Sequence, residues 1–171
     1  THTDLAAGDS LWSVTITGKN ALVGECSNVP SDAVIKNAEG DTVTNSYNIH
    51  YVNGTLRIKV KALTITTRDS SKVYDGTELI CHTYTCTGLC ATDSIKDVEM
   101  LSKITYAGTI DNVIGSVDIV NHNNISIAGK DTDVTNCYQI QYIYGKLAVA
   151  KKDLTITADS DTKVYDGTPL S

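Results

Sequence analysis

Hydrophobic and polar residues alternate along several short stretches of this chain. The clearest is residues 47–60, YNIHYVNGTLRIKV, in which two alternating runs flank an Asn-Gly pair. Alternation with a period of two is typical of a strand with one buried face. Asn-Gly is the preferred centre of a two-residue hairpin loop, because both central positions need a positive φ. The pattern therefore predicts a β-hairpin with Asn53 and Gly54 at its tip.

The two-residue loop also predicts the register of this hairpin. Tyr51 would face Leu56 and Ile49 would face Ile58 on an apolar face, whereas His50 would lie on the solvated face. A slip of one residue would turn the polar side chains into the core, so the register should be well specified.

The same pattern occurs a second time. YNIHYVNGTL at residues 47–56 returns as YQIQYIYGKL at residues 138–147, which is 91 positions later, and the stretches LTIT (residues 63–66) and KVYDGT (residues 72–77) return at the same offset. Several matches in one order indicate an internal repeat. The second copy has Tyr144-Gly145 at its turn, where a Tyr with positive φ is unfavourable, so we expect another turn type or a strained residue there.

The offset changes near the N-terminus. AGDS at residues 7–10 matches ATDS at residues 91–94, an offset of 84, whereas Gly24 aligns with Gly115 at an offset of 91. This alignment places seven additional residues of the second copy between these two points. Insertions of that size are tolerated in loops, so we expect a longer loop there.

A period near 90 residues predicts two tandem β units. Residues 1–61 would form a first unit that lacks its opening LTIT–KVYDGT segment, residues 62–151 a complete unit, and residues 152–171 the opening segment of a third. Short joints predict closely abutted units, and the chain reads as a fragment of a longer protein. Seven or eight short strands per unit favour an all-β, immunoglobulin-like sandwich. A β-grasp-like unit is the alternative, but it needs a helix, and no segment has a sustained 3.6-residue period.

KVYDGT is predicted to form a tight turn in each copy. Asp75-Gly76 and Asp166-Gly167 would make the turn, because Gly tolerates φ > 0 and Asp bonds its own backbone. LTIT should form a strand, and further strands are expected at residues 79–86, 94–99, 103–106, 115–120 and 125–128.

The incomplete first unit and the unaccompanied last segment suggest an exchange. Residues 154–170 of one molecule could complete the 1–61 unit of another by strand addition at an open edge. Such a head-to-tail contact is heterologous and could produce chains of molecules. The alternative is that the tail is frayed and the first unit tolerates the gap.

Charge limits the classes of partner. The net charge is -6, which disfavours nucleic acid and anionic membranes because both require a basic surface. No stretch approaches the roughly 20 apolar residues of a membrane span, so no membrane insertion is expected within this sequence.

The five cysteines are not shared between the two copies. They are Cys26, Cys81, Cys86, Cys90 and Cys137. An odd number excludes complete intrachain pairing, and both free buried thiols and a single disulfide remain open. The spacing of Cys81, Cys86 and Cys90 around His82 differs from usual zinc sites, so no metal is assigned.

Other candidate chemistry is weak. Asp131 and Asp133, and likewise Asp159 and Asp161, alternate as in calcium loops, but the twelve-residue ligand pattern is missing. No hydrolase, metalloprotease or nucleotide-binding motif is present, so neither an enzyme nor a cofactor is predicted. The candidates for ligand binding are the aromatic residues Trp12 and Tyr144, which have no aromatic counterparts in the other copy.

One family combines these motifs. The order LTIT, KVYDGT, TYTCTGL (residues 83–89), ATD and VTNCYQIQYIYGKLAV resembles the MBG/YDG-type tandem repeats of large bacterial surface proteins. The resemblance covers nearly the whole chain and implies an extracellular, cell-wall or cell-surface, adhesin-like module without catalytic residues. It favours a structural stalk, with a weak multivalent module for host glycans, mucin or matrix protein as the alternative. The five cysteines and Tyr144 depart from the family pattern.

Overall fold

The computed structural model describes residues 4–122 and 131–170. Within these ranges the chain is almost entirely β, with two single-turn 3₁₀ helices, η1 (Thr44–Ser46) and η2 (Thr135–Cys137). The strands are β1 (Ser10–Thr17), β2 (Gly24–Lys36), β3 (Gly54–Ile58), β4 (Lys61–Thr67), β5 (Ser70–Val73), β6 (Tyr84–Thr87), β7 (Asp93–Met100), β8 (Gly108–Asp111), β9 (Ile114–Asn121), β10 (Thr132–Asp133), β11 (Tyr138–Ile143) and β12 (Lys146–Ala150). The all-β prediction is confirmed.

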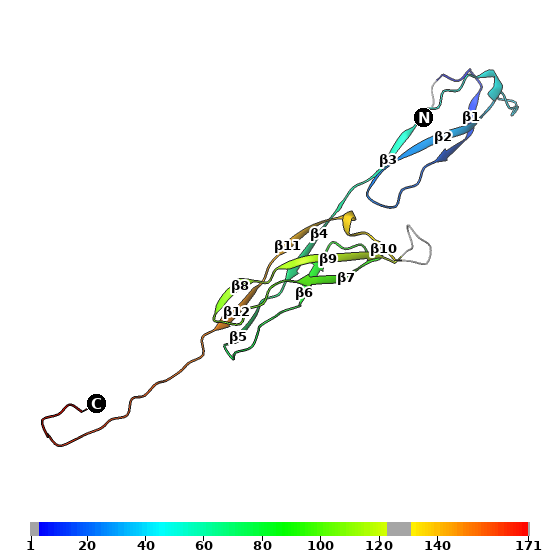
Figure 1. Ribbon diagram of the computed structural model, residues 1–171. Coiled ribbons are helices and arrows are strands. Elements are labelled where there is room, and N and C mark those ends of the chain that lie inside the picture. The colour runs from blue at the N-terminus through cyan, green and yellow to red at the C-terminus, as the bar shows by residue number, and fades with distance from the viewer. Residues whose placement is uncertain (1–3, 123–130, 171) are drawn as a thin grey trace.

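Three segments follow one another along an elongated molecule (Figure 1). We call residues 4–58 the N-terminal unit, residues 61–150 the C-terminal unit and residues 152–170 the tail. The N-terminal unit and the tail lie at opposite ends, with the C-terminal unit between them.

The N-terminal unit contains one antiparallel sheet in the order β1-β2-β3. The long strand β2 pairs with β3 through residues 24–28 and with β1 through residues 29–36. Within residues 4–58, Ile35 is the one apolar side chain that is buried, so this unit has a thin core.

The C-terminal unit has three sheets, in the orders β10-β9-β7, β11-β4-β6 and β5-β12-β8. Strands β4 and β5 run parallel to β11 and β12, respectively, with Leu63 opposite Ile140 and Lys72 opposite Val149. Both chain segments therefore pass side by side from one sheet to the next. Alternate residues of β4 face the core, where Leu63 and Ile65 are completely buried.

The point at which the two segments change sheets is held by buried polar groups. The Thr67 hydroxyl donates to the carbonyl of Asn112 (2.8 Å) and accepts from the amide of Gly145 (2.9 Å). The amide of Asn112 donates to the carbonyl of Gly145 (2.8 Å), and its side-chain amide donates to the carbonyls of Arg68 and Cys81. These contacts satisfy backbone groups that leave the ladders at the bend.

The predicted hairpins are wrong. Residues 47–53 are not paired, and β3 pairs with β2 instead, while β11 and β12 lie in different sheets. In the described part of the chain the non-glycine residues with positive φ are Asp4 and Asp32, so Asn53 does not adopt the predicted turn and Tyr144 is not strained by a positive φ. In the C-terminal unit, β11 and β12 pair with β4 and β5 and pack into a larger core. The burial of apolar side chains in that core outweighs the local preference for a hairpin.

The position of the seven-residue difference also needs correction. Ile58 of β3 faces Gly24, and Val149 of β12 faces Gly108, so strand pairing matches Gly24 with Gly108 rather than with Gly115. The pairing of β1 with β2 follows that of β7 with β9 at the offset of 84, except at Thr15, which faces Ser31 whereas Glu99 faces Ser116. The extra residues thus lie after β9, before Val134.

The other strand predictions have mixed outcomes. LTIT of residues 63–66 lies in β4, and the predictions at residues 94–99 and 115–120 are confirmed by β7 and β9. Of residues 79–86, the final three belong to β6, and residues 103–106 form a single bridge through Ile104 to Leu79. The prediction at residues 125–128 lies outside the described residues.

The second LTIT stretch is not a strand. The tail is extended and unpaired, and Leu154 and Ile156 are 81% and 86% exposed, whereas their counterparts Leu63 and Ile65 are 1% and 0% exposed.

Among the described residues, no helix has the length and apolar character needed to cross a membrane.

Candidate functional site

One hollow lies in the N-terminal unit. It has a volume of about 780 Å³ and is lined by apolar residues of β1 and β2 and by the unpaired residues 47–53. Ile16 and Tyr51 are 53% and 44% exposed there. We call this hollow the open groove, and define it by Val14, Ile16, Ile35, Tyr47, Ile49 and Tyr51.

The corresponding place in the C-terminal unit is filled by β4. At the offset of 91, Ile49 and Tyr51 correspond to Ile140 and Tyr142, which face Leu63 and Ile65 across a parallel ladder. The open groove therefore exists because, within the described residues, the N-terminal unit has no strand in the position of β4.

A tyrosine of the open groove, Tyr47, is held by the same contacts as its counterpart Tyr138. The hydroxyl of Tyr47 donates to a carboxylate oxygen of Asp9 (2.6 Å) and accepts from the amide of Ala6 (2.9 Å). Tyr138 bonds Asp93 and the amide of Cys90 in the same way. The hydrogen bond to Asp9 raises the pKa of Tyr47, and burial with the bond to Asp93 raises the pKa of Tyr138.

The KVYDGT stretch forms a turn held by its own side chains. The ammonium of Lys72 bonds Asp75 (2.7 Å) and the hydroxyl of Thr77 (2.6 Å), and Asp75 also accepts the amide of Thr77 (2.9 Å). Gly76 has a φ of +84°, which suits glycine. These bonds, first that from Lys72, hold the pKa of Asp75 well below its usual range.

The tail copy of this turn has the same contacts without any packing around it. Lys163 bonds Asp166 (2.8 Å) and Thr168 (2.5 Å), and Gly167 has a φ of +77°. Hydrogen bonds from Lys163 and Thr168 lower the pKa of Asp166. The turn is therefore a local structure that does not need the rest of the unit.

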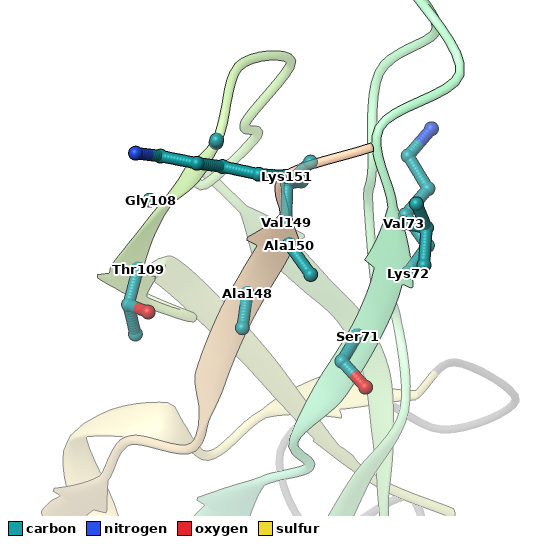
Figure 2. A pocket seen from close by; sticks show the side chains of 10 residues that line it. Ser71, Lys72, Val73, Gly108, Thr109, Ala148, Val149, Ala150 and Lys151 are labelled. Carbon is teal, nitrogen blue, oxygen red and sulfur yellow. The ribbon is translucent and has the colours of Figure 1, made fainter. Parts of the chain in front are cut away.

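A shallow hollow of about 630 Å³ lies on the outer face of β5, β12 and β8 (Figure 2). Small side chains form its floor, and Figure 2 shows Ser71 on β5, Thr109 on β8, and Ala148 and Ala150 on β12 between them. The ammonium of Lys72, a residue that lines this hollow, bonds Asp75 and Thr77.

The two predicted ligand-binding residues lie in different units. Trp12 on β1 is 67% exposed, and the ammonium of Lys36 lies 4.2 Å from the centre of its ring. Tyr144 lies between β11 and β12 and stacks on Tyr142, with ring centroids 6.1 Å apart. The structure does not bring Trp12 and Tyr144 into one surface.

The predicted calcium residues make other contacts. Asp131 pairs with His122 (2.9 Å), and Asp133 accepts the amide of Thr135, which lowers its pKa. Asp159 and Asp161 are exposed in the tail. Among the described residues no group of three or more His, Cys, Asp or Glu side chains is arranged to hold a metal ion.

All five cysteines are free and half-buried. The Cys81 thiol lies 2.9 Å from the hydroxyl of Thr83, and the Cys90 sulfur lies 3.5 Å from the ammonium of Lys61. Burial raises the pKa of the Cys86 thiol, which reduces its thiolate fraction at neutral pH.

Sequence reasoning did not find two sets of residues. One is the polar group Thr67, Asn112 and Gly145, which links segments too far apart for any local pattern to connect. The other is the groove-lining pair Val14 and Ile16, whose alternation in β1 was a usable signal.

Comparisons with known proteins supply no relative. No protein-family model matches the chain, and no curated protein or solved structure matches it either.

Proposed function

We propose that this chain is a non-enzymatic spacer of a bacterial extracellular surface protein, built from tandem units of the immunoglobulin-like sandwich type. The MBG/YDG-like order of sequence motifs supports the extracellular location. The arrangement of the first and last strands of the C-terminal unit supports the mechanical role, and it is the observation on which this proposal depends.

The C-terminal unit is entered at β4 and left at β12. The segment β4–β5 and the segment β11–β12 run parallel, with six facing residue pairs between β4 and β11 and four between β5 and β12. Tension applied at Lys61 and Ala150 therefore slides the two segments along each other. Hydrogen bonds loaded in shear share the force, whereas bonds that are unzipped break one at a time.

The joint between the units also suits a spacer. Residues 59 and 60 alone connect β3 to β4, and Leu22 of the N-terminal unit packs against the core of the C-terminal unit. A short joint with an apolar contact limits bending between the units. The two units therefore stay extended and transmit force from one to the other.

Single-molecule pulling on the intact chain tests the mechanical role. We expect the C-terminal unit to unfold at a several-fold higher force when it is pulled through Lys61 and Ala150 than through Lys61 and Tyr138. The second pair of attachment points lies on facing residues and unzips the same ladder, so it serves as the matched control. Equal forces in the two geometries would contradict the proposal.

A weak multivalent adhesive module is the second candidate. The exposed ring of Trp12, with Lys36 beside it, favours this alternative because exposed aromatic residues commonly anchor ligands. Beads that display the whole chain at high density should bind host glycans, mucin or matrix protein and lose that binding in Trp12→Ala. Failure to bind across the panel would remove the adhesive candidate and leave the spacer.

A further inference from the structure

We propose that the open groove of the N-terminal unit binds the tail, residues 154–170, of a second copy of this chain. The tail would bind as two consecutive strands in the positions of β4 and β5. These strands would run parallel to residues 47–52 and to β3, respectively. This proposal does not depend on the spacer function, because it concerns only the fit between two parts of the described chain.

The C-terminal unit shows what the docked state would look like. Leu63 faces Ile140 and Ile65 faces Tyr142 in the parallel ladder of β4 and β11. The offset of 91 converts these pairs into Leu154 opposite Ile49 and Ile156 opposite Tyr51. Docking would bury two apolar side chains that are now almost fully exposed and would cover the apolar groove at the same time.

The second half of the tail has a site as well. Val149 of β12 faces Lys72 of β5, and the corresponding residues are Ile58 of β3 and Lys163 of the tail. One side of β3 is paired with β2, and its other side has no strand partner among the described residues. The KVYDGT turn that follows is already formed in the tail, so docking does not have to order it.

A polar group of the groove matches the contact that secures the bend of β4–β5. Asn112 donates its side-chain amide to the carbonyl of Arg68, and strand pairing matches Asn112 with Asn28. Asn28 lines the open groove next to Gly54. Its amide would therefore donate to the carbonyl of Asp159, the tail residue that corresponds to Arg68.

One groove residue opposes docking. Asp4 stands where the C-terminal unit has Gly88, and a Cβ on Gly88 would lie 2.5 Å from the carbonyl oxygen of Ala62. The tail residue that corresponds to Ala62 is Asp153. Asp4 must shift when the tail enters, so Asp4→Gly should tighten the association.

The occupant comes from a second molecule because of the shape of the chain. The tail and the N-terminal unit lie at opposite ends of the molecule, separated by the C-terminal unit (Figure 1). A contact between unlike surfaces does not close on itself unless the rotation allows a ring, so open head-to-tail chains are expected.

Sedimentation velocity of the intact chain, from about 1 μM to about 1 mM, tests the proposal. The mean mass should rise with concentration for the wild type, and Leu154→Asp should weaken association by roughly tenfold or more. Val164→Asp is the matched control, because the counterpart Val73 is 57% exposed in β5 and points away from the core. This variant should associate like the wild type.

Gly54→Ala is the complementary variant on the groove side. The nearest atoms to a Cβ on Gly54 belong to Asn28, and the closest lies at 3.6 Å, an ordinary contact, so the monomer should keep its thermal stability. A Cβ on the counterpart Gly145 would lie 2.6 Å from the backbone of Arg68, so Gly54→Ala should abolish tail docking.

Three outcomes would overturn the proposal. These are a wild type that stays monomeric at every concentration, equal weakening by Leu154→Asp and Val164→Asp, and undiminished association of Gly54→Ala. Equal weakening by the two tail variants would show that the exposed apolar tail associates non-specifically. A photoreactive group at residue 156 in a mixture of ¹⁴N and ¹⁵N chains should crosslink to residues near Tyr51 of the other isotope.

Discussion

At the scale of single residues, the repeated KVYDGT stretch is explained by its side chains. Lys72, Asp75 and Thr77 bond one another in the packed unit, and Lys163, Asp166 and Thr168 do the same in the unpacked tail. The Asp carboxylate accepts both the backbone amide and the hydroxyl of the Thr, while Gly takes the positive φ. A local hydrogen-bond pattern therefore accounts for the motif without a ligand.

The lowered pKa of Asp75 predicts a pH-dependent contribution to stability. Its folded-state pKa lies below the unfolded value of about 3.9, so the contribution is complete above that pH and is lost as the pH falls toward the folded-state pKa. The difference in free energy of unfolding between wild type and Asp75→Asn should thus be constant near neutral pH and shrink below about pH 4. Urea denaturation at a series of pH values measures it.

Asp166→Asn is the control for this prediction. Its turn has the same bonds but packs against nothing in the monomer, so the substitution should leave the free energy of unfolding unchanged at every pH in dilute solution. A difference for Asp75→Asn that persists undiminished to pH 2 would contradict the assignment.

At the scale of elements, the predicted hairpins are absent. In the C-terminal unit two chain segments instead pass side by side from one sheet to another. The segments β4–β5 and β11–β12 bend together, and Gly145 lies against the backbone of Thr67 and Arg68 at that bend. Glycine is needed there for space rather than for a positive φ. The absence of a side chain lets two backbones approach within hydrogen-bonding distance.

Gly145→Ala should therefore destabilise the C-terminal unit. Its Cβ would lie 2.7 Å from the carbonyl oxygen of Thr67. The backbone of Thr67 is held by strand pairing, so moving it away strains the structure. We expect the free energy of unfolding to fall by about 1–3 kcal/mol, measured by chemical denaturation. Gly54→Ala at the corresponding position should cost much less in the monomer, and an equal loss in both variants would argue against the close approach as the cause.

At the scale of the whole molecule, Leu22 makes an apolar contact between the two units. Leu22 packs on the C-terminal core, whereas Tyr106, which strand pairing places at the corresponding position of the C-terminal unit, is 74% exposed and stacks on Tyr74.

Leu22→Asp should loosen the joint between the units. A charged side chain cannot occupy an apolar contact without loss of hydration, so the units should tumble more independently. ¹⁵N relaxation of the intact chain should then give shorter rotational correlation times for the N-terminal unit. Tyr106→Asp is the matched control and should leave these values unchanged, and the same change in both variants would contradict a specific role for Leu22.

The sequence by itself determined the β class, the repeated motifs and the KVYDGT turn, because these depend on alternation and on bonds between near neighbours. The repeat also led to the prediction that residues 154–170 pair with residues 1–61 of another molecule, and this stays a prediction. Strand pairing could not be derived in the same way. Asn53-Gly54 favours a hairpin locally, but pairing of β4 with β11 buries Leu63 and Ile65, and that gain depends on residues more than 70 positions away.

The groove was likewise decided by tertiary structure. Val14 and Ile16 alternate in the sequence as core residues do, yet they remain partly exposed because the strand that would cover them is absent from the described unit. The contacts of Thr67, Asn112 and Gly145 join three distant segments, and their chemistry exists only where two backbones meet. Local sequence sets which structures a segment can form, and burial of the whole chain selects among them.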